Sequence, residues 1–467
     1  RLLRHARSLV KKGCILAGIK SGATQAGSRA AASHTGAMAT SDIFVAALFD
    51  KAGILRVNSR EALIDIVCVV KAAKGRIRGK RVCIVTDAGG PGVMLADELT
   101  RGGMELPSLS PATLGKLQEI LPKESSLMNP IDALPSRTAA QIGAIIEVLN
   151  ADERHNLDAV AVLTGDSGLS DNSEIYQRIG REMQRSSIPV LPMLSSLTSC
   201  REKIAEFVQA GNTYFPYEVA LGTALAKVAS WQEPEEYSGS PRDYHKEEID
   251  RALQNHQGAL EPATVARILK AAGIPQPPQA EVFSEDQLEN GCKQVGYPLV
   301  MKVIGPLHKT DVGGVRLGIE NDASARAAWA EMMTIDGAEG VLLQPMIGGQ
   351  EVIVGASRED QFGHLIMFGL GGIHAEVLKD ARFALAPLTE NEAMRLIDGI
   401  RSRPLLDGVR GAPGMNVAIL AEIIQRMGQL VTDFPQIGEI DLNPVKGTGD
   451  NLWAVDARII VSPTGDL

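Results

Sequence analysis

Short apolar runs alternate with helical patterns along most of this 467-residue chain. The alternation is typical of parallel α/β domains, because each buried parallel strand needs a crossover helix before the next one. The run RVCIVT, which starts at Arg81, is followed at once by DAGGPGVMLADELT, a turn and a helical pattern. Similar apolar runs lie at 157–163, 188–194, 299–304, 340–346 and 351–356. The sequence therefore predicts an α/β protein built on parallel sheets.

Chain length and one polar stretch suggest how the chain is divided. At roughly 150 residues per domain, 467 residues give about three domains. The stretch WQEPEEYSGSPRDYHKEE reads as an exposed linker over 232–248. We expect a unit at 1–75 that is too short for a complete doubly wound domain, a second at 78–231 and a third at 249–467. Because Arg1 already lies in a helical pattern, we expect the chain to begin inside a domain.

Charge and cysteine content exclude several classes of partner. The chain carries 47 basic and 56 acidic residues, a net charge of −9, so no basic field attracts nucleic acid or an anionic membrane. No apolar stretch approaches the ~18 residues of a membrane-spanning helix. The five cysteines are odd in number and form no CxxC pair, as expected of reduced thiols in a cytoplasmic protein.

A glycine cluster, GGPG, follows the strand at Arg81. Glycines at 89, 90 and 92 allow close approach of the backbone, and free N–H groups at a helix start favour an anion. This makes the cluster a candidate phosphate site. A plain tight βα turn would give the same residues, and the cluster matches neither GxGxxG nor GxxxxGK[ST], so it does not by itself indicate nucleotide binding.

A second candidate is the small-residue loop SRAAASHTGAMAT, which carries His34 and Gly36. A neutral imidazole can attack a phosphoryl group and release it again near neutral pH. An inert surface histidine is the alternative.

The stretch YPLVMKVIGPLHKTDVGGVRLGI carries Lys302 at the end of a strand, followed by a loop with His308. A strand lysine facing phosphates under a covering loop is a recurrent phosphoryl-transfer arrangement. Downstream, Glu439, Asp441 and Asn443 alternate along one strand and Asp456 lies on the next. Carboxylate and amide oxygens on adjacent strands suit Mg²⁺, although the solvated faces of a β-pair would show the same pattern.

Taken together, these motifs resemble the ADP-forming (NDP-forming) acyl-CoA synthetases, relatives of succinyl-CoA synthetase. SHTGAMATSD resembles the phosphohistidine loop of that family, and VTDAGGPGVMLADEL with MNPIDAL resembles its second flavodoxin-like domain. VMKVIGPLHKTDVGGVRL, QEVIVG, FGLGGIHAEVLKD, EIDLNPV and AVDARI resemble its ATP-grasp domain. The resemblance implies two flavodoxin-like parallel-sheet domains, the first truncated and bearing the phosphohistidine loop, followed by an ATP-grasp domain.

The resemblance also implies roles for individual residues. His34 would accept the phosphoryl group, and His308 would relay it between distant sites. Helix starts near Gly36 and Gly92 would hold the phosphoryl charge, with Gly89 and Gly90 in the second of them. The residues implied in nucleotide binding are Lys302, Gln344, Pro345, Met346, Glu351 and Arg382, and those implied in Mg²⁺ binding are Asn443 and Asp456.

The chain departs from the family pattern at several positions. The family often has two more residues between Pro306 and His308, and His374 stands where a bulky apolar residue is usual. Arg382 precedes the family's common arginine position, Ala384 here, by two residues, so it keeps the same strand face. The resemblance further implies that an upstream CoA-binding Rossmann domain is missing, and that thioester formation fails without it.

The implied activity is acyl-CoA + ADP + phosphate ⇌ carboxylic acid + CoA + ATP, through acyl-phosphate and phosphohistidine intermediates. The implied substrates are ATP or ADP, CoA and a small carboxylic acid, and we expect a homo-oligomer. Two alternatives stay open at this point. One is a regulatory module of a protein acetyltransferase, and the other is a non-catalytic nucleotide-binding subunit.

Overall fold

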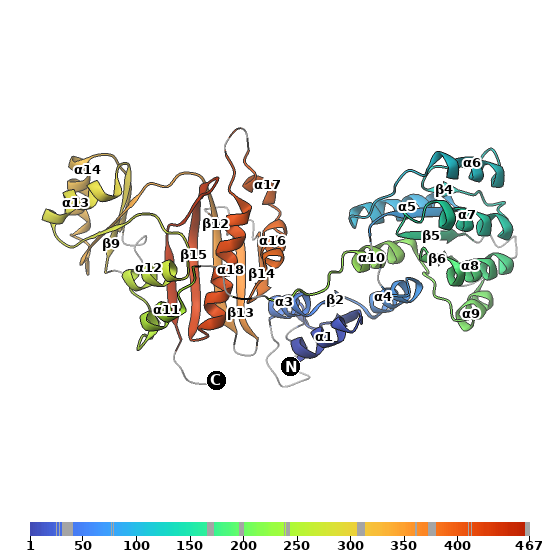
Figure 1. Ribbon diagram of the computed structural model, residues 1–467, viewed down its shortest axis with the longest axis horizontal. Coiled ribbons are helices and arrows are strands. Elements are labelled where there is room, and N and C mark those ends of the chain that lie inside the picture. Colours follow the sequence, from blue (N-terminus) through green and yellow to red (C-terminus); the bar gives the residue numbers. More distant parts are fainter. Residues whose placement is uncertain are drawn as a thin grey trace. The chain divides into compact units, whose positions relative to one another are not determined.

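The computed structural model describes the whole chain except residues 25, 28, 30–40, 76, 78, 166–171, 196–199, 238, 240–242, 306–312, 360–361, 372–379, 410, 412 and 463–467. It divides into two compact units, Arg1–Pro234 and Glu235–Leu467. Figure 1 shows their secondary structure, and each unit is described by itself.

The first unit is built around a parallel four-stranded sheet. Its strands are β3 (Val82–Thr86), β4 (Ile131–Asp132), β5 (Ala159–Thr164) and β6 (Val190–Leu194), in the order β4-β3-β5-β6. β3, β5 and β6 are buried along their whole length, which is why they read as unbroken apolar runs.

Helices cover both faces of this sheet. Alternate strand residues share one core with α4 (Arg60–Ala72), α5 (Gly89–Arg101) and α10 (Glu218–Ala229). The other strand residues share a second core with α6 (Pro111–Ile120), α7 (Ala139–Asp152), α8 (Ser173–Arg185) and α9 (Arg201–Gln209). The arrangement is a doubly wound α/β fold.

The first 75 residues add a small parallel pair to this unit. β1 (Leu16–Ile19) pairs with β2 (Ile54–Val57), and the accompanying helices are α1 (Leu2–Lys11) and α3 (Asp42–Ala52). Leu55 and Val57 of β2 belong to the same core as α4 and the larger sheet. The indole Nε1 of Trp231 donates a hydrogen bond to the Gly53 carbonyl at 2.9 Å, so the segment after α10 is fixed to this region.

The second unit contains two antiparallel sheets. The smaller one has the order β10-β9-β11-β8, and α13 (Glu285–Val295) and α14 (Asp322–Met332) pack on it. Its strands are β8 (Ala280–Val282), β9 (Leu299–Ile304), β10 (Val315–Ile319) and β11 (Gly340–Pro345). Each described pairing between these strands is antiparallel, so the parallel sheet predicted for a flavodoxin-like domain is confined to the first unit.

The larger sheet has the order β14-β13-β12-β15-β17-β7, with β16 beside β15. Its strands are β7 (Gly258–Ala259), β12 (Gln350–Glu359), β13 (Gly363–Leu370), β14 (Ala381–Leu385), β15 (Ile437–Thr448), β16 (Asn451–Ala454) and β17 (Ala457–Val461). One core joins it to α11 (Lys246–Leu253), α12 (Pro262–Ala271), α16 (Glu390–Asp398) and α18 (Val417–Asp433), and α17 (Arg403–Leu406) lies between the last two in sequence. Since Ile440 and Leu442 of β15 face these helices, Asp441 between them faces the opposite side.

Candidate active site

The first candidate region is the carboxyl edge of the parallel sheet. β3 ends at Thr86, and α5 begins at Gly89, three residues before the start near Gly92 that the sequence indicated. The Thr86 hydroxyl accepts a hydrogen bond from the Ala88 N–H at 3.1 Å and donates one to the Ala88 carbonyl at 2.8 Å. Ala88 has no side-chain oxygen to cap the helix, and the N–H groups of Gly89 and Gly90 donate to no other described residue. Free donors of this kind can bind an anion.

Three of the four predicted phosphate-binding glycines are described by the structure, and they differ in their surroundings. A Cβ on Gly92 would lie 2.9 Å from the Thr86 Cγ2, so packing of the helix on β3 explains a glycine there. Gly89 and Gly90 are exposed, and a Cβ on either would meet nothing within 4 Å. The open space that close approach of a ligand requires is therefore at residues 89 and 90.

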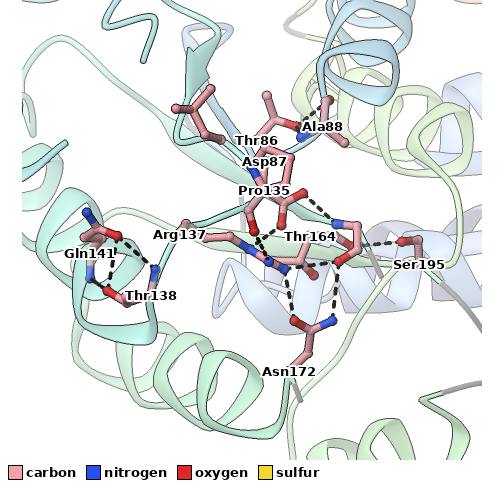
Figure 2. A network of polar contacts seen from close by, with 12 residues as sticks. Thr86, Asp87, Ala88, Pro135, Arg137, Thr138, Gln141, Thr164, Asn172 and Ser195 are labelled. Carbon is pink, nitrogen blue, oxygen red and sulfur yellow. Dashed lines mark hydrogen bonds and ion pairs between the residues drawn. The ribbon is translucent and has the colours of Figure 1, made fainter. Parts of the chain in front are cut away.

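A buried polar network lies at the same edge (Figure 2). The Asp87 Oδ1 accepts a hydrogen bond from the Gly165 N–H at 2.7 Å, and Oδ2 lies 2.5 Å from the Arg137 Nε. The two side chains are 2% and 5% exposed. Burial raises the pKa of Asp87 to about 6, and the Asp132 charge adds to this, while the Gly165 N–H and the Arg137 charge lower it. Asp87 is therefore mainly ionised at neutral pH.

The second candidate region begins with Lys302 on β9. Met301 packs in the core with α13 and α14, so Lys302 faces the other side of the small sheet. Its side chain is buried, and Nζ donates a hydrogen bond to the Val455 carbonyl at 3.0 Å. The structure thus brings the predicted phosphate-binding lysine to the segment that carries Asp456.

The predicted metal ligands are adjacent at the large sheet, where Asn443 lies on β15 and Asp456 lies in the bend between β16 and β17 rather than on a strand as expected. The Asn443 N–H donates to the Asp456 carbonyl at 3.1 Å, and both residues are exposed. Asp441 lies on the same strand face as Asn443. Burial raises the pKa of Asp441, and the charges of Glu439 and Asp456 raise it further, although a hydrogen bond with Asn443 lowers it. A cation at this position would relieve that repulsion.

The donor set fits Mg²⁺ better than a metal held by protein alone. Within the described residues, no group of three or more His, Cys, Asp or Glu side chains is placed to hold a metal ion. Mg²⁺ commonly takes one or two carboxylates and completes its shell with water and substrate phosphates. Asp441, Asn443 and Asp456 supply oxygens of this kind.

Gln344 lies on the same face of the small sheet as Lys302. In the β9–β11 pairing, Leu342 is opposite Lys302 and Gln344 is opposite Val300. The Gln344 Nε2 donates to the Gln279 Oε1 at 3.2 Å, whereas its own Oε1 is buried and accepts no hydrogen bond from the described residues. A buried acceptor without a donor is costly and suits a ligand that brings an N–H group.

The neighbouring predicted residues offer no main-chain donor to a ligand. The Met346 N–H already donates to the Pro298 carbonyl at 2.9 Å, and Pro345 has no N–H. The region therefore presents acceptors and an apolar surface, since the Met346 side chain is 47% exposed.

Glu351 and Arg382, the other two residues predicted to bind nucleotide, differ in their contacts and in their positions in the large sheet. The Glu351 Oε1 accepts a hydrogen bond from the Lys446 Nζ at 2.7 Å, and the two residues are directly paired across β12 and β15. Arg382 is exposed on β14, and its Nη1 donates to the Ala381 carbonyl at 3.2 Å. The strand order β14-β13-β12-β15 separates it from Asn443, so the structure does not bring Arg382 to the other predicted residues.

Three predicted residues, His34, Gly36 and His308, lie outside the described residues. The structure adds residues that the sequence did not single out as site residues, namely Asp87, Arg137, Gln279 and Lys446. Asp87 has a recognisable signal, because it directly follows a buried strand. Arg137 has no such signal, since 50 positions separate it in the sequence from Asp87, its ion-pair partner.

Two comparisons with protein families agree with these regions. Residues 251–461 match the ATP-grasp domain family, and residues 1–70 match the family described as succinyl-CoA ligase like flavodoxin domain. In the described part of the chain, no helix combines the length and the apolar character needed to cross a membrane.

Known proteins resemble the whole chain or about half of it. An acetate–CoA ligase [ADP-forming] I from Archaeoglobus fulgidus is 31% identical over 99% of this chain, which covers 68% of that protein. The acetate–CoA ligase [ADP-forming] I subunit beta from Pyrococcus furiosus is 40% identical over 46% of this chain and 97% of that subunit. Among solved structures, the dinucleotide-forming acetyl-coenzyme A synthetase 1 of Candidatus Korarchaeum cryptofilum, in complex with coenzyme A, Ca-AMPCP and HgCl⁺, is 31% identical. That match covers 46% of this chain and 99% of the matched one, with a TM-score of 0.44.

A doubly wound unit followed by an ATP-grasp domain defines a ligase of the succinyl-CoA synthetase-like superfamily. Within it, the chain belongs to the ADP-forming acyl-CoA synthetases, which are acid–thiol ligases that use ATP or ADP together with CoA. The predicted family and the predicted fold class, flavodoxin-like parallel sheet and ATP-grasp domain, are confirmed.

Proposed function

We propose that this chain carries out the phosphoryl-transfer steps of an ADP-forming acyl-CoA synthetase. The overall reaction is acyl-CoA + ADP + phosphate ⇌ carboxylic acid + CoA + ATP. Phosphate displaces the CoA thiolate and forms an acyl phosphate, whose phosphoryl group His34 then takes as the carboxylate leaves. His308 relays the group to ADP. Because the phosphoryl group moves in several short in-line transfers, it can travel from the acyl phosphate to ADP over a distance that a single displacement cannot cover.

The observation that carries this proposal is the hydrogen bond from Lys302 to the Val455 carbonyl. It connects the lysine of the small sheet to the segment that carries Asp456, beside Asn443 on the large sheet. This contact supports a site in which Lys302 would bind phosphate beside the oxygen ligands of a metal, although about 150 positions separate them in the sequence. Phosphoryl transfer requires that combination to neutralise charge on the phosphates.

Mg²⁺ is the metal that this site fits. Asn443 and Asp456, with Asp441 nearby, would hold it, and a bound Mg²⁺ would neutralise charge on the nucleotide phosphates. The free Gln344 Oε1 supports a nucleotide base on the same face, because an adenine amino group can donate to it. Glu351, held by Lys446, would accept from a ribose hydroxyl, and Arg382 would contact phosphate only if its side chain leaves the Ala381 carbonyl.

The first unit supplies the other end of the transfer. Phosphohistidine at His34 would be held by helix starts near Gly36 and at Gly89, Gly90 and Gly92. We propose the same domain limits as before, 1–75, 78–231, the linker 232–248 and 249–467. The homo-oligomer and the cytoplasmic location stay predictions.

Nucleotide binding and phosphorylation test this function together. Calorimetry with ADP should show binding that requires Mg²⁺ and that weakens in Asp456→Asn. Incubation with Mg-ATP labelled at the γ-phosphate should give an acid-labile, base-stable label. Label of that kind in a His34→Ala, His308→Ala double variant contradicts the proposal, and ADP binding with no phosphoenzyme indicates a non-catalytic subunit.

A further inference from the structure

The order of the parallel strands marks one point on the first unit where ligands are expected. From β3 the chain moves to β4 on one side of it and then to β5 on its other side. In open α/β sheets, ligands bind in the crevice outside the carboxyl ends of the two strands where the direction reverses. Here those ends are Asp87, after β3, and Gly165, after β5, and the 2.7 Å hydrogen bond between them crosses this point.

Arg137 joins the surrounding segments to that bond. Its Nη1 donates to the Pro135 carbonyl at 2.9 Å, and its Nη2 donates to the Gly165 carbonyl at 3.1 Å and to the Asn172 Oδ1 at 3.0 Å. The Nε faces Asp87. One planar guanidinium thus connects the segments that follow β3, β4 and β5 with the residue that precedes α8 (Figure 2).

The position of Arg137 is itself fixed by the start of the next helix. Thr138 and Gln141 form a capping box at the N-terminus of α7, in which each side chain accepts a hydrogen bond from the backbone of the other. Because Arg137 directly precedes Thr138, the backbone at Arg137 cannot shift without disrupting that cap.

These contacts indicate that Arg137 acts through its neighbours. Its side chain is 5% exposed, and protein groups already occupy both ends of the guanidinium, so little of it is free for a ligand. A buried ion pair of this kind is often no more stabilising than well-packed apolar residues, and its best-supported use is to specify geometry. The geometry specified here is the spacing of two strand ends beside the open first turn of α5.

We propose that Arg137 is a positioning residue, which holds the ends of β3 and β5 so that the first turn of α5 binds a phosphoryl group. This inference rests on the proposed function for the nature of the group. Asp87 is its partner in this role, because its two carboxylate oxygens connect Arg137 with the Gly165 N–H.

Hydrogen exchange of the whole chain with and without inorganic phosphate tests the proposal, because it requires no catalysis. In the wild type, phosphate should slow exchange in the peptide that covers the first turn of α5. Arg137→Lys keeps the positive charge but loses the planar guanidinium group with its several N–H donors, and it should weaken phosphate binding by about tenfold or more. Its exchange without phosphate should stay close to wild type, which a merely structural defect would not allow. Arg101→Lys, on the exposed face of α5, is the matched control and should bind phosphate as the wild type does.

Two results would overturn the proposal: a wild-type peptide that shows no response to phosphate, or an Arg137→Lys variant that binds phosphate within about twofold of wild type. If Arg137→Lys does not fold, Asn172→Ala decides, because it removes the Asn172 hydrogen bonds with Arg137 and with the Gly165 carbonyl but keeps the ion pair. It should lower phosphate affinity, and unchanged affinity would refute the role. A chain that shows the phosphate response but forms no phosphoenzyme from Mg-ATP contradicts the proposed function and supports this inference.

Discussion

Replacement of Arg137 by methionine should reduce the stability of the first unit strongly. The substitution keeps an unbranched chain but leaves the Asp87 carboxylate, 2% exposed, without its cation. Breaking a buried ion pair from one side costs about 3–5 kcal/mol, because the remaining charge has lost its water and its partner. This range of free energy already includes the loss of the hydrogen bonds from Arg137 to the Gly165 carbonyl and to the Asn172 side chain.

The loss should grow with pH. In the folded wild type the pKa of Asp87 is raised to about 6, so the folded state holds a proton that the unfolded state releases near its ordinary value of 3.8. Stability from this group therefore falls as pH rises from about 4 to about 6 and then levels off. Because the Arg137 charge lowers the pKa of Asp87, the pKa of Asp87 should be higher still in the variant. The variant should thus keep losing about 1.4 kcal/mol per pH unit above pH 6, up to its own raised pKa.

Urea unfolding at pH 5.5 and pH 8 measures this effect. A Trp329→Phe, Trp453→Phe background leaves Trp231 as the fluorescent reporter, and Trp231 packs against a core of the first unit. Arg101→Met is the matched control, since that arginine is 68% exposed and its ion pairs should be worth less than about 1 kcal/mol. A loss below about 1 kcal/mol for Arg137→Met, or a loss equal at both pH values, would refute the reasoning.

Three further predictions concern other parts of the chain. Lys302→Met should slow phosphoenzyme formation from Mg-ATP by about 100-fold, as measured by rapid-quench labelling. Lys293→Met, at an exposed position of α13, is the control and should not change the rate. Equal rates for the two variants would contradict the role of Lys302. Gly92→Ala should lower the free energy of unfolding by about 1–3 kcal/mol, because its Cβ would lie 2.9 Å from the Thr86 Cγ2. In the same urea assay, Gly90→Ala should leave the free energy of unfolding unchanged, because its Cβ would meet nothing within 4 Å. The reverse order would be inconsistent with the packing described. Glu153→Gln should lower the free energy of unfolding by about 1–3 kcal/mol. Burial raises the pKa of Glu153, but hydrogen bonds from Thr113, Ser110 and Asn156 outweigh the effect of burial and lower the pKa overall. This contribution is present above the ordinary pKa and is lost on acidification, so the wild type and the variant should converge at low pH; a constant difference would count against it.

The elements that could be predicted from the sequence are those whose burial is complete. β3 and β5 read as strands because they are apolar on both faces, and β9 reads as one because Lys302 is its only charged residue. The direction of pairing in the second unit could not be predicted, because the same apolar runs serve parallel and antiparallel sheets alike. β14 and β10 have half-exposed patterns that carry little signal.

The candidate site shows the same division. Lys302 is a charged residue in an apolar strand, which is a signal the sequence carries, whereas Asn443 on β15 and Asp456 in the bend before β17 are exposed. The structure brings the segments of all three residues together. Arg382 could be placed on a strand from the sequence but not on a sheet position, since strand order depends on pairing between distant segments. Arg137 and Gln279 gain their significance only from contacts with residues far along the chain.

The most direct test of the account is the site of phosphorylation. The full chain is incubated with Mg-ATP, digested at neutral to alkaline pH to preserve phosphohistidine, and analysed by fragmentation mass spectrometry. We expect the phosphate on His34 in the wild type, none in His34→Ala, and its return to ATP when excess Mg-ADP is added. Phosphate on a serine, threonine or aspartate, or a His34 phosphate that Mg-ADP cannot remove, would contradict the central claim.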